Sequence, residues 1–136
     1  MTKERLRRYL KIRAEKKQIE NMLLNLEVRL YSPKSQQLTG MLAASSKQGG
    51  SEQERLADKV IDLRRKYLEV QAALIEEQLA IEVAIESLEP IQRILLRYRY
   101  IDGMTWARIG RKMGYGDAQV FRIHTEALQA LESAEE

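Results

Sequence analysis

The sequence contains no cysteine and a single histidine. Without cysteine the chain can form neither disulfides nor thiolate zinc sites, and it has no thiol nucleophile. With one histidine and no cysteine, a site of histidine and cysteine metal ligands is excluded as well. We therefore expect no metal and no cofactor.

Catalytic motifs are also missing. Glu76 and Glu77 are neighbours on one helix and point apart, so they cannot act as a general acid and base pair. Gly49-Gly50 lacks the lysine and the serine or threonine that follow in a phosphate-binding loop. We expect that the protein is not an enzyme.

Aromatic residues and prolines are scarce, at 6% and two residues, whereas charged residues make up 32% of the chain. This mixture suits helices with one apolar stripe better than a sheet, which favours aromatic and β-branched side chains. No apolar run is long enough to span a bilayer, and the first residues carry charge where a signal peptide has an apolar core. We expect an all-α protein of the cytoplasm with no membrane partner.

Charge is distributed unevenly along the chain. Residues 1–30 carry nine Lys and Arg against four Asp and Glu, whereas residues 51–87 carry five against nine. These two segments have opposite net charge and attract one another. Residues 88–124 carry seven basic and three acidic side chains, so a second basic region lies near the C-terminus.

Two segments carry apolar side chains at alternating three- and four-residue steps, which is the spacing of a coiled-coil seam. In the first, about residues 3–30, the seam is Tyr9, Ile12, Ile19, Leu23, Leu26 and Leu30. In the second, about residues 52–88, it is Leu56, Val60, Leu63, Tyr67, Val70, Leu74, Ile81, Ile85 and Leu88. Ser51 and Glu54 form a capping-box pattern, which predicts where the second helix begins.

These segments predict a hairpin domain over residues 1–88, with two antiparallel helices joined by a loop at 31–50. The loop is rich in Ser, Gln, Gly and Pro, and a connection of this length is either functional or mobile. Parallel dimerisation is the competing arrangement of the helices. Because two helices bury few side chains on their outer faces, we expect the hairpin to pack against a second copy, with a dimer favoured, or against the C-terminal module.

Residues 89–133 are predicted to form a second, helical domain. Pro90 cannot continue the preceding helix but fits the first turn of a new one. The expected buried face of this new helix is Ile91, Ile94, Leu95 and Tyr98. The sequence Ile101-Asp102-Gly103 is a turn signal that ends it.

The stretch from Thr105 to Thr125 has the spacing of a helix-turn-helix. Thr105 is expected to cap the first helix, and Gly114 to supply the left-handed conformation of the turn. Gly110 lies on the inner face, where a side chain would hold the second helix away. The residues expected in the core are Trp106, Ile109, Met113, Val120 and Ile123, whereas His124 is expected near the DNA backbone or solvent.

The outer face of the second helix would enter the major groove of double-stranded DNA. The expected DNA-contacting residues on this helix are Asp117, Ala118, Gln119, Phe121, Arg122 and Thr125. Arg122 suits guanine or phosphate, Gln119 suits adenine, and Phe121 suits a thymine methyl. Asp117 either accepts from a cytosine amine or caps the helix.

Further side chains, most of them basic, are candidates for phosphate contacts. Those placed with the first helix of the motif are Thr105, Arg108, Arg111 and Lys112, which complete the expected DNA-binding set. Arg93 and Arg97 are either phosphate contacts or solvated surface. The N-terminal basic run either binds DNA or complements the acidic second helix, and we favour the second role.

The C-terminal motifs resemble region four of bacterial sigma factors, the domain that reads the upstream promoter hexamer. The matching residues are Leu88-Glu89-Pro90, Arg97-Tyr98-Arg99-Tyr100, Gly103-Met104-Thr105-Trp106, Ile109-Gly110, Met113-Gly114, Val120-Phe121-Arg122-Ile123-His124 and Ala127-Leu128. With the basic first helix, Ser32-Pro33-Lys34-Ser35 followed by Gly40-Met41, and the acidic helix, the whole chain resembles phage late-gene regulators of the RinA and ArpU type. This resemblance implies a phage or prophage transcriptional regulator, acting in a bacterial host on promoter DNA, RNA polymerase or both.

The chain departs from the sigma pattern at Gly116, where Ser or Thr is usual, and at Asp117, Thr125 and Glu126, where basic residues are frequent. No segment resembles the other sigma regions, so a complete sigma factor is not indicated. Two alternative functions stay open: a phage DNA-packaging adaptor similar to small terminase subunits, and an RNA polymerase-binding module without its own DNA contact. The sequence indicates neither the operator nor whether a regulator would activate or repress.

Overall fold

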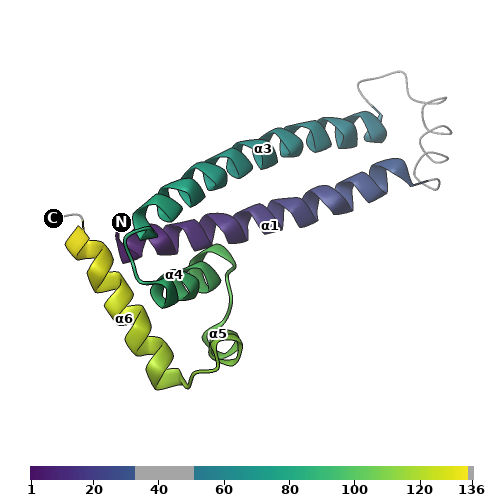
Figure 1. Cartoon of the computed structure of the whole chain (residues 1–136). Coiled ribbons are helices and arrows are strands. Elements are labelled where there is room, and N and C mark those ends of the chain that lie inside the picture. Colours follow the sequence, from purple (N-terminus) through teal and green to yellow (C-terminus); the bar gives the residue numbers. More distant parts are fainter. Residues whose placement is uncertain (33–50, 135–136) are drawn as a thin grey trace. The chain divides into compact units, whose positions relative to one another are not determined.

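The computed structural model describes residues 1–32 and 51–134, which are mainly helical (Figure 1). These residues contain no strand, so the predicted all-α class is confirmed. The loop predicted at residues 31–50 lies outside the described residues, except for Tyr31 and Ser32 at its start. None of the described helices is both long and apolar enough to cross a membrane.

Two long helices come first: α1 spans Lys3–Tyr31 and α3 spans Glu52–Ile85. The start of α3 is capped as predicted, because the Glu54 N–H donates to Ser51 Oγ at 3.2 Å. After Ile85 the chain turns through residues 86–88. Arg93 Nη1 holds this turn by donating to the carbonyl oxygens of Glu86 and Leu88, both at 3.2 Å.

The chain forms two compact units, Ala14–Ala72 and Met1–Arg13 with Ala73–Glu136. Each long helix contributes one segment to each unit. The first turns of α1 and the last turns of α3 thus belong to the same unit as the C-terminal helices. A functional boundary at residue 88 stays a prediction.

In the unit Ala14–Ala72, segments of α1 and α3 run antiparallel. Arg64 Nη2 pairs with Glu27 Oε1 at 2.8 Å, and Lys66 Nζ lies 3.9 Å from Glu15 Oε1. The buried seam residues are Ile19, Leu30 and Val60. Leu23, Leu26, Leu56, Leu63, Tyr67 and Val70, also predicted in the seam, are only partly buried.

The other unit contains the larger core. Its C-terminal elements are α4 Pro90–Leu96, the π-helical turn η1 Arg97–Ile101, α5 Trp106–Met113 and α6 Asp117–Ala134. Side chains from every helix of the unit are fully buried, among them Leu6, Ile81, Ile85, Leu95, Leu96, Ile109, Val120 and Leu131. Pro90 occupies the first turn of α4 as predicted.

The buried face of α4 and η1 differs from the predicted one. Leu95 is buried as expected, but Ile94 is 42% exposed, and Leu96 and Tyr100 are buried in place of Ile91 and Tyr98. The cause at Tyr100 is the wide π-helical turn, in which the Asp102 N–H donates to the Arg97 carbonyl at 2.9 Å. An i to i+5 bond adds a residue to the turn and shifts the face that meets the core.

Candidate nucleic-acid interface

Helices α5 and α6 form the predicted helix-turn-helix. Thr105 caps α5, because its Oγ1 accepts from the Arg108 N–H at 3.2 Å. Gly114 ends α5 in the left-handed conformation, with φ of 74°. The N–H groups of Gly114 and Tyr115 both donate to the Gly110 carbonyl, at 2.9 and 3.0 Å. Capping and turn therefore agree with the sequence.

Gly110 is required at this place, but for a different main reason than expected. A Cβ atom at Gly110 would lie 2.9 Å from the Tyr115 carbonyl oxygen, which is closer than real contacts allow, and 3.9 Å from Val120 Cγ2. The first is a clash with rigid backbone, whereas the second is an ordinary contact. The glycine thus makes room for the turn that follows α5 more than for α6.

Trp106 is not a core residue, contrary to the prediction. It is partly exposed, and its ring lies 5.2 Å from the Phe121 ring and 4.7 Å from the His124 ring, measured between centroids. The guanidinium carbon of Arg99 lies 4.4 Å from the centroid of the indole. The indole is thus held between a cation and two rings at the edge of the unit.

His124 is buried, with 7% of its surface exposed, so its expected place near DNA or solvent is wrong. A hydrogen bond of 2.7 Å joins its Nε2 to Tyr100 Oη. Burial, and then the charges of Lys3, Arg99 and Arg7, lower the pKa of His124 from 6.5 to about 4. The imidazole is therefore neutral at pH 7. Its position in the apolar series Val120, Ile123, His124, Ala127 and Leu131 was a sequence signal for burial.

The ten residues expected to contact DNA all lie at the surface. Gln119 is partly exposed, and the other nine are exposed: Thr105, Arg108, Arg111, Lys112, Asp117, Ala118, Phe121, Arg122 and Thr125. On α6 the exposed residues recur at three- and four-residue steps, so they share one face, opposite the buried Val120 and Ile123. Surface exposure is what a contact with DNA requires, and their role in binding stays a prediction.

Two of the arginines considered for phosphate contact are engaged within the protein. Arg93 holds the turn before α4, as described above. Arg97 binds Glu82 in a bidentate pair, with Nη2 2.8 Å and Nε 3.1 Å from its carboxylate oxygens. This hydrogen bonding raises the pKa of Arg97.

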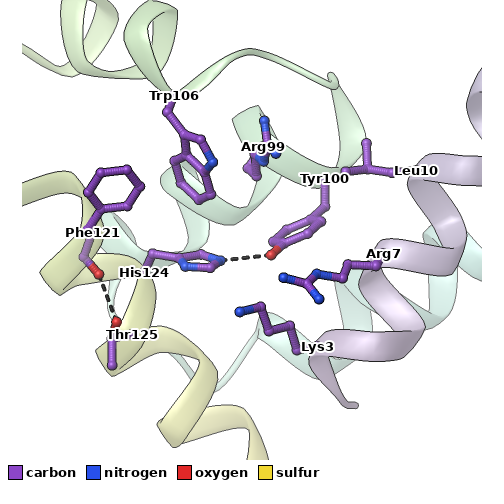
Figure 2. Close-up of a pocket in the computed structure, with 9 residues that line it drawn as sticks. All are labelled: Lys3, Arg7, Leu10, Arg99, Tyr100, Trp106, Phe121, His124 and Thr125. Carbon is purple, nitrogen blue, oxygen red and sulfur yellow. Dashed lines mark hydrogen bonds between the residues drawn. The ribbon is translucent and has the colours of Figure 1, made fainter. Parts of the chain in front are cut away.

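The N-terminal basic run divides into paired and unpaired side chains. Arg5 binds Glu77 on α3, with Nε and Nη2 each 3.0 Å from a carboxylate oxygen, as the complementary charges suggested. Lys3 and Arg7 form no ion pair with the described residues, and both extend toward the Tyr100–His124 hydrogen bond (Figure 2). Sequence reasoning missed this grouping, because residues from opposite ends of the chain meet there.

The fold and the exposed face of α6 define a helix-turn-helix protein. Residues 84–132 match the family model of sigma-70 region 4. That family is a helix-turn-helix DNA-binding module, so the C-terminal part of the chain is similar to a DNA-binding domain of the sigma type. No curated protein and no solved structure matches the chain.

Proposed function

We propose that the protein is a transcriptional regulator, encoded by a phage or prophage, that binds promoter DNA through α5 and α6. The observation that carries this proposal is the match of residues 84–132 to sigma-70 region 4, over a helix-turn-helix whose outer face is exposed. The remaining helices would support self-association. The phage context rests on the resemblance to late-gene regulators.

The proposed reading face consists of Ala118, Phe121, Arg122 and Thr125 on α6. Arg122 is exposed and forms no ion pair with the described residues, so its guanidinium is free for guanine O6 and N7. Phe121 is 46% exposed and presents ring surface for a thymine methyl. Asp117 begins α6, where its charge favours the helix dipole.

Phosphate contacts are proposed for the side chains on and before α5. Arg108, Arg111 and Lys112 are exposed and form no ion pair with any described residue. The Lys112 ammonium lies 5.6 Å from the centroid of the Tyr98 ring, which leaves its charge unneutralised. Contacts of this kind fix the orientation of a helix-turn-helix on the duplex.

The test is binding to DNA fragments from the protein's own genomic neighbourhood, at two salt concentrations and with excess competitor DNA. We expect a protected site that survives competitor. Arg122→Ala should weaken binding by about 1 to 3 kcal/mol and relax specificity at one position. The matched control is Arg65→Ala, an exposed arginine of α3, which should leave binding unchanged. If Arg122→Ala weakens binding equally on all sequences, Arg122 is only a phosphate contact. If the protein protects no site on any fragment, the proposal is contradicted.

A second candidate function is an RNA polymerase-binding module without its own DNA contact. It is favoured by the exposed acidic residues Asp117 and Glu126 on α6, which make this helix less basic than is usual in sigma factors. Capture of RNA polymerase without retardation of any DNA fragment would support this function over the first. Binding of both would indicate a regulator acting beside a host sigma factor.

Self-association is proposed through the outer face of α3. On the part of α3 that belongs to the unit with α6, large apolar side chains recur at steps of four residues and are more than half exposed: Ile75, Leu79 and Val83. A second copy would cover this seam. Light scattering should show a dimer that Ile75→Gln with Leu79→Gln converts to a monomer. A monomeric wild-type protein would contradict self-association, and a ring larger than a tetramer would favour a DNA-packaging adaptor.

A further inference from the structure

A pocket of about 340 Å³ opens beside α6, within the unit that contains the helix-turn-helix (Figure 2). We call it the basic pocket. Its walls come from the first turns of α1, from η1, from the start of α5 and from α6, and the residues are Lys3, Arg7, Leu10, Arg99, Tyr100, Trp106, Phe121, His124 and Thr125. A volume of this size is within the range of small-ligand sites.

Positive charge in the basic pocket is not neutralised. Lys3, Arg7 and Arg99 line it, no Asp or Glu does, and none of the three forms an ion pair with a described residue. Arg99 Nη1 donates to the Met104 carbonyl at 2.9 Å, which fixes the guanidinium and leaves other N–H groups free. By contrast, the neighbouring arginines Arg5 and Arg97 each bind a glutamate. Among the described residues, the cations that line the pocket are therefore unpaired, whereas arginines close to them in the sequence form ion pairs.

The buried side chains of His124 and Tyr100 lie close to these positive charges. His124 and Tyr100 share their hydrogen bond at its inner wall, where the side chains of Lys3 and Arg7 converge (Figure 2). The charges of Lys3, Arg99 and Arg7 all act on His124 and help lower its pKa. Three like charges that act at one point favour an anion of more than one charge.

The other side of the pocket is aromatic. The rings of Trp106 and Phe121 lie 5.2 Å apart at an angle of 56°, and nearly half of Phe121 is exposed. Thr125 Oγ1 donates to the Phe121 carbonyl at 2.9 Å, which leaves the hydroxyl oxygen free to accept. The pocket thus combines cationic donors with ring surface, as a site for a phosphorylated compound does.

We propose that the basic pocket binds a phosphate group through Lys3, Arg7 and Arg99. A phosphate has several acceptor oxygens and more than one charge, so it matches three cationic donors better than a carboxylate does. Two sources supply this chemistry: a free nucleotide, whose base would contact Trp106 and Phe121, and the backbone of the duplex that α6 contacts. The second source rests on the proposed function, because Phe121 and Thr125 belong to both surfaces.

Trp106 makes the pocket directly observable, because it is the only tryptophan of the chain. The full-length protein is titrated with inorganic pyrophosphate, with adenosine monophosphate and with a duplex carrying the protected site, while tryptophan fluorescence is followed. The pocket variant is Lys3→Gln with Arg7→Gln. The matched control is Arg8→Gln with Lys11→Gln, which removes the same charge from exposed residues of α1 outside the pocket. Circular dichroism verifies that both variants fold.

If the ligand is free, pyrophosphate or the mononucleotide gives a saturable change in fluorescence. Binding is then at least about tenfold weaker in the pocket variant, near wild type in the control, and unchanged by Arg122→Ala. If the phosphate belongs to DNA, the free probes give no response. Duplex affinity and its salt slope then fall in the pocket variant more than in the control, the slope by about one to two.

If the pocket variant and the control behave equally in every titration, the proposal is overturned. Loss of two positive charges anywhere on α1 would then explain the change in affinity. Failure of the proposed function is recognised separately. If the wild-type protein binds no duplex, that function fails, and the titrations with pyrophosphate and the mononucleotide alone decide whether the pocket takes phosphate.

Discussion

The two compact units differ in how much apolar surface they bury. The described part of the unit Ala14–Ala72 consists of two helix segments and fully buries few large side chains, among them Ile19 and Val60, whereas Met22, Leu24 and Val28 stay exposed. The unit with α4, α5 and α6 buries side chains from every helix it contains. The two described helix segments enclose little core between them, so we expect stability to reside mainly in the unit with α6.

The largest expected effect is in the core of the unit with α6. Leu95 of α4 is fully buried, so Leu95→Ala should lower the free energy of unfolding by about 2 to 5 kcal/mol. Leu23→Ala in the other unit truncates a partly exposed leucine and should cost less. Urea unfolding followed by Trp106 fluorescence and by circular dichroism checks this, and equal losses would contradict the contrast between the units.

The buried His124 should make stability depend on pH. Its pKa is about 4 in the folded chain, against the ordinary value of 6.5 that applies to the unfolded chain. Above pH 6.5 the imidazole is neutral in both states, and as the pH falls the unfolded chain takes up the proton first. The free energy of unfolding should therefore fall by roughly 1.4 kcal/mol per pH unit between 6.5 and 4, about 3 kcal/mol in total, and then level off.

The control for this pH dependence is His124→Gln, measured by the same urea unfolding from pH 7 to 4. The difference in stability between wild type and variant isolates the imidazole. The hydrogen bond with Arg5 lowers the pKa of Glu77, so its stabilising contribution is lost as the pH falls below about 4.5. This loss occurs in both proteins and cancels in the difference. A difference that does not change with pH would show that His124 is not buried as a neutral group.

A smaller effect is expected at the turn of the helix-turn-helix. Gly110→Ala places a methyl group against the Tyr115 carbonyl and should cost about 1 to 3 kcal/mol, since backbone cannot move aside cheaply. Gly116→Ala meets nothing within 4 Å and should cost less, because only the preference against alanine at the N-cap of α6 opposes it. Thermal unfolding of the two variants compares them, and a harmless Gly110→Ala would mean that the turn can shift.

The smallest effect is expected in the unit Ala14–Ala72. Arg64 and Glu27 form a surface ion pair, with 47% and 29% of their side chains exposed. Arg64→Ala should therefore lower stability only slightly at low salt, and less at high salt. Unfolding at two salt concentrations measures this, and a loss as large as that of Leu95→Ala would invert the comparison between the units.

Local features were predictable from the sequence. Ser51 caps α3, Pro90 begins α4, Thr105 caps α5 and Gly114 adopts the left-handed turn, each as expected. These features follow from hydrogen bonds and dihedral preferences within a few residues, which a sequence displays directly. The helix-turn-helix pattern was recognisable for the same reason.

Features that depend on distant residues were not predictable. The sequence by itself determined the helices, their caps and the face of α6 that is exposed, because these depend on local backbone chemistry and on apolar periodicity. The tertiary structure alone decided that His124 is buried against Tyr100, that Arg97 binds Glu82, and that Lys3 and Arg7 meet Trp106 in one pocket. Such contacts join residues far apart in the chain, and only packing brings them together.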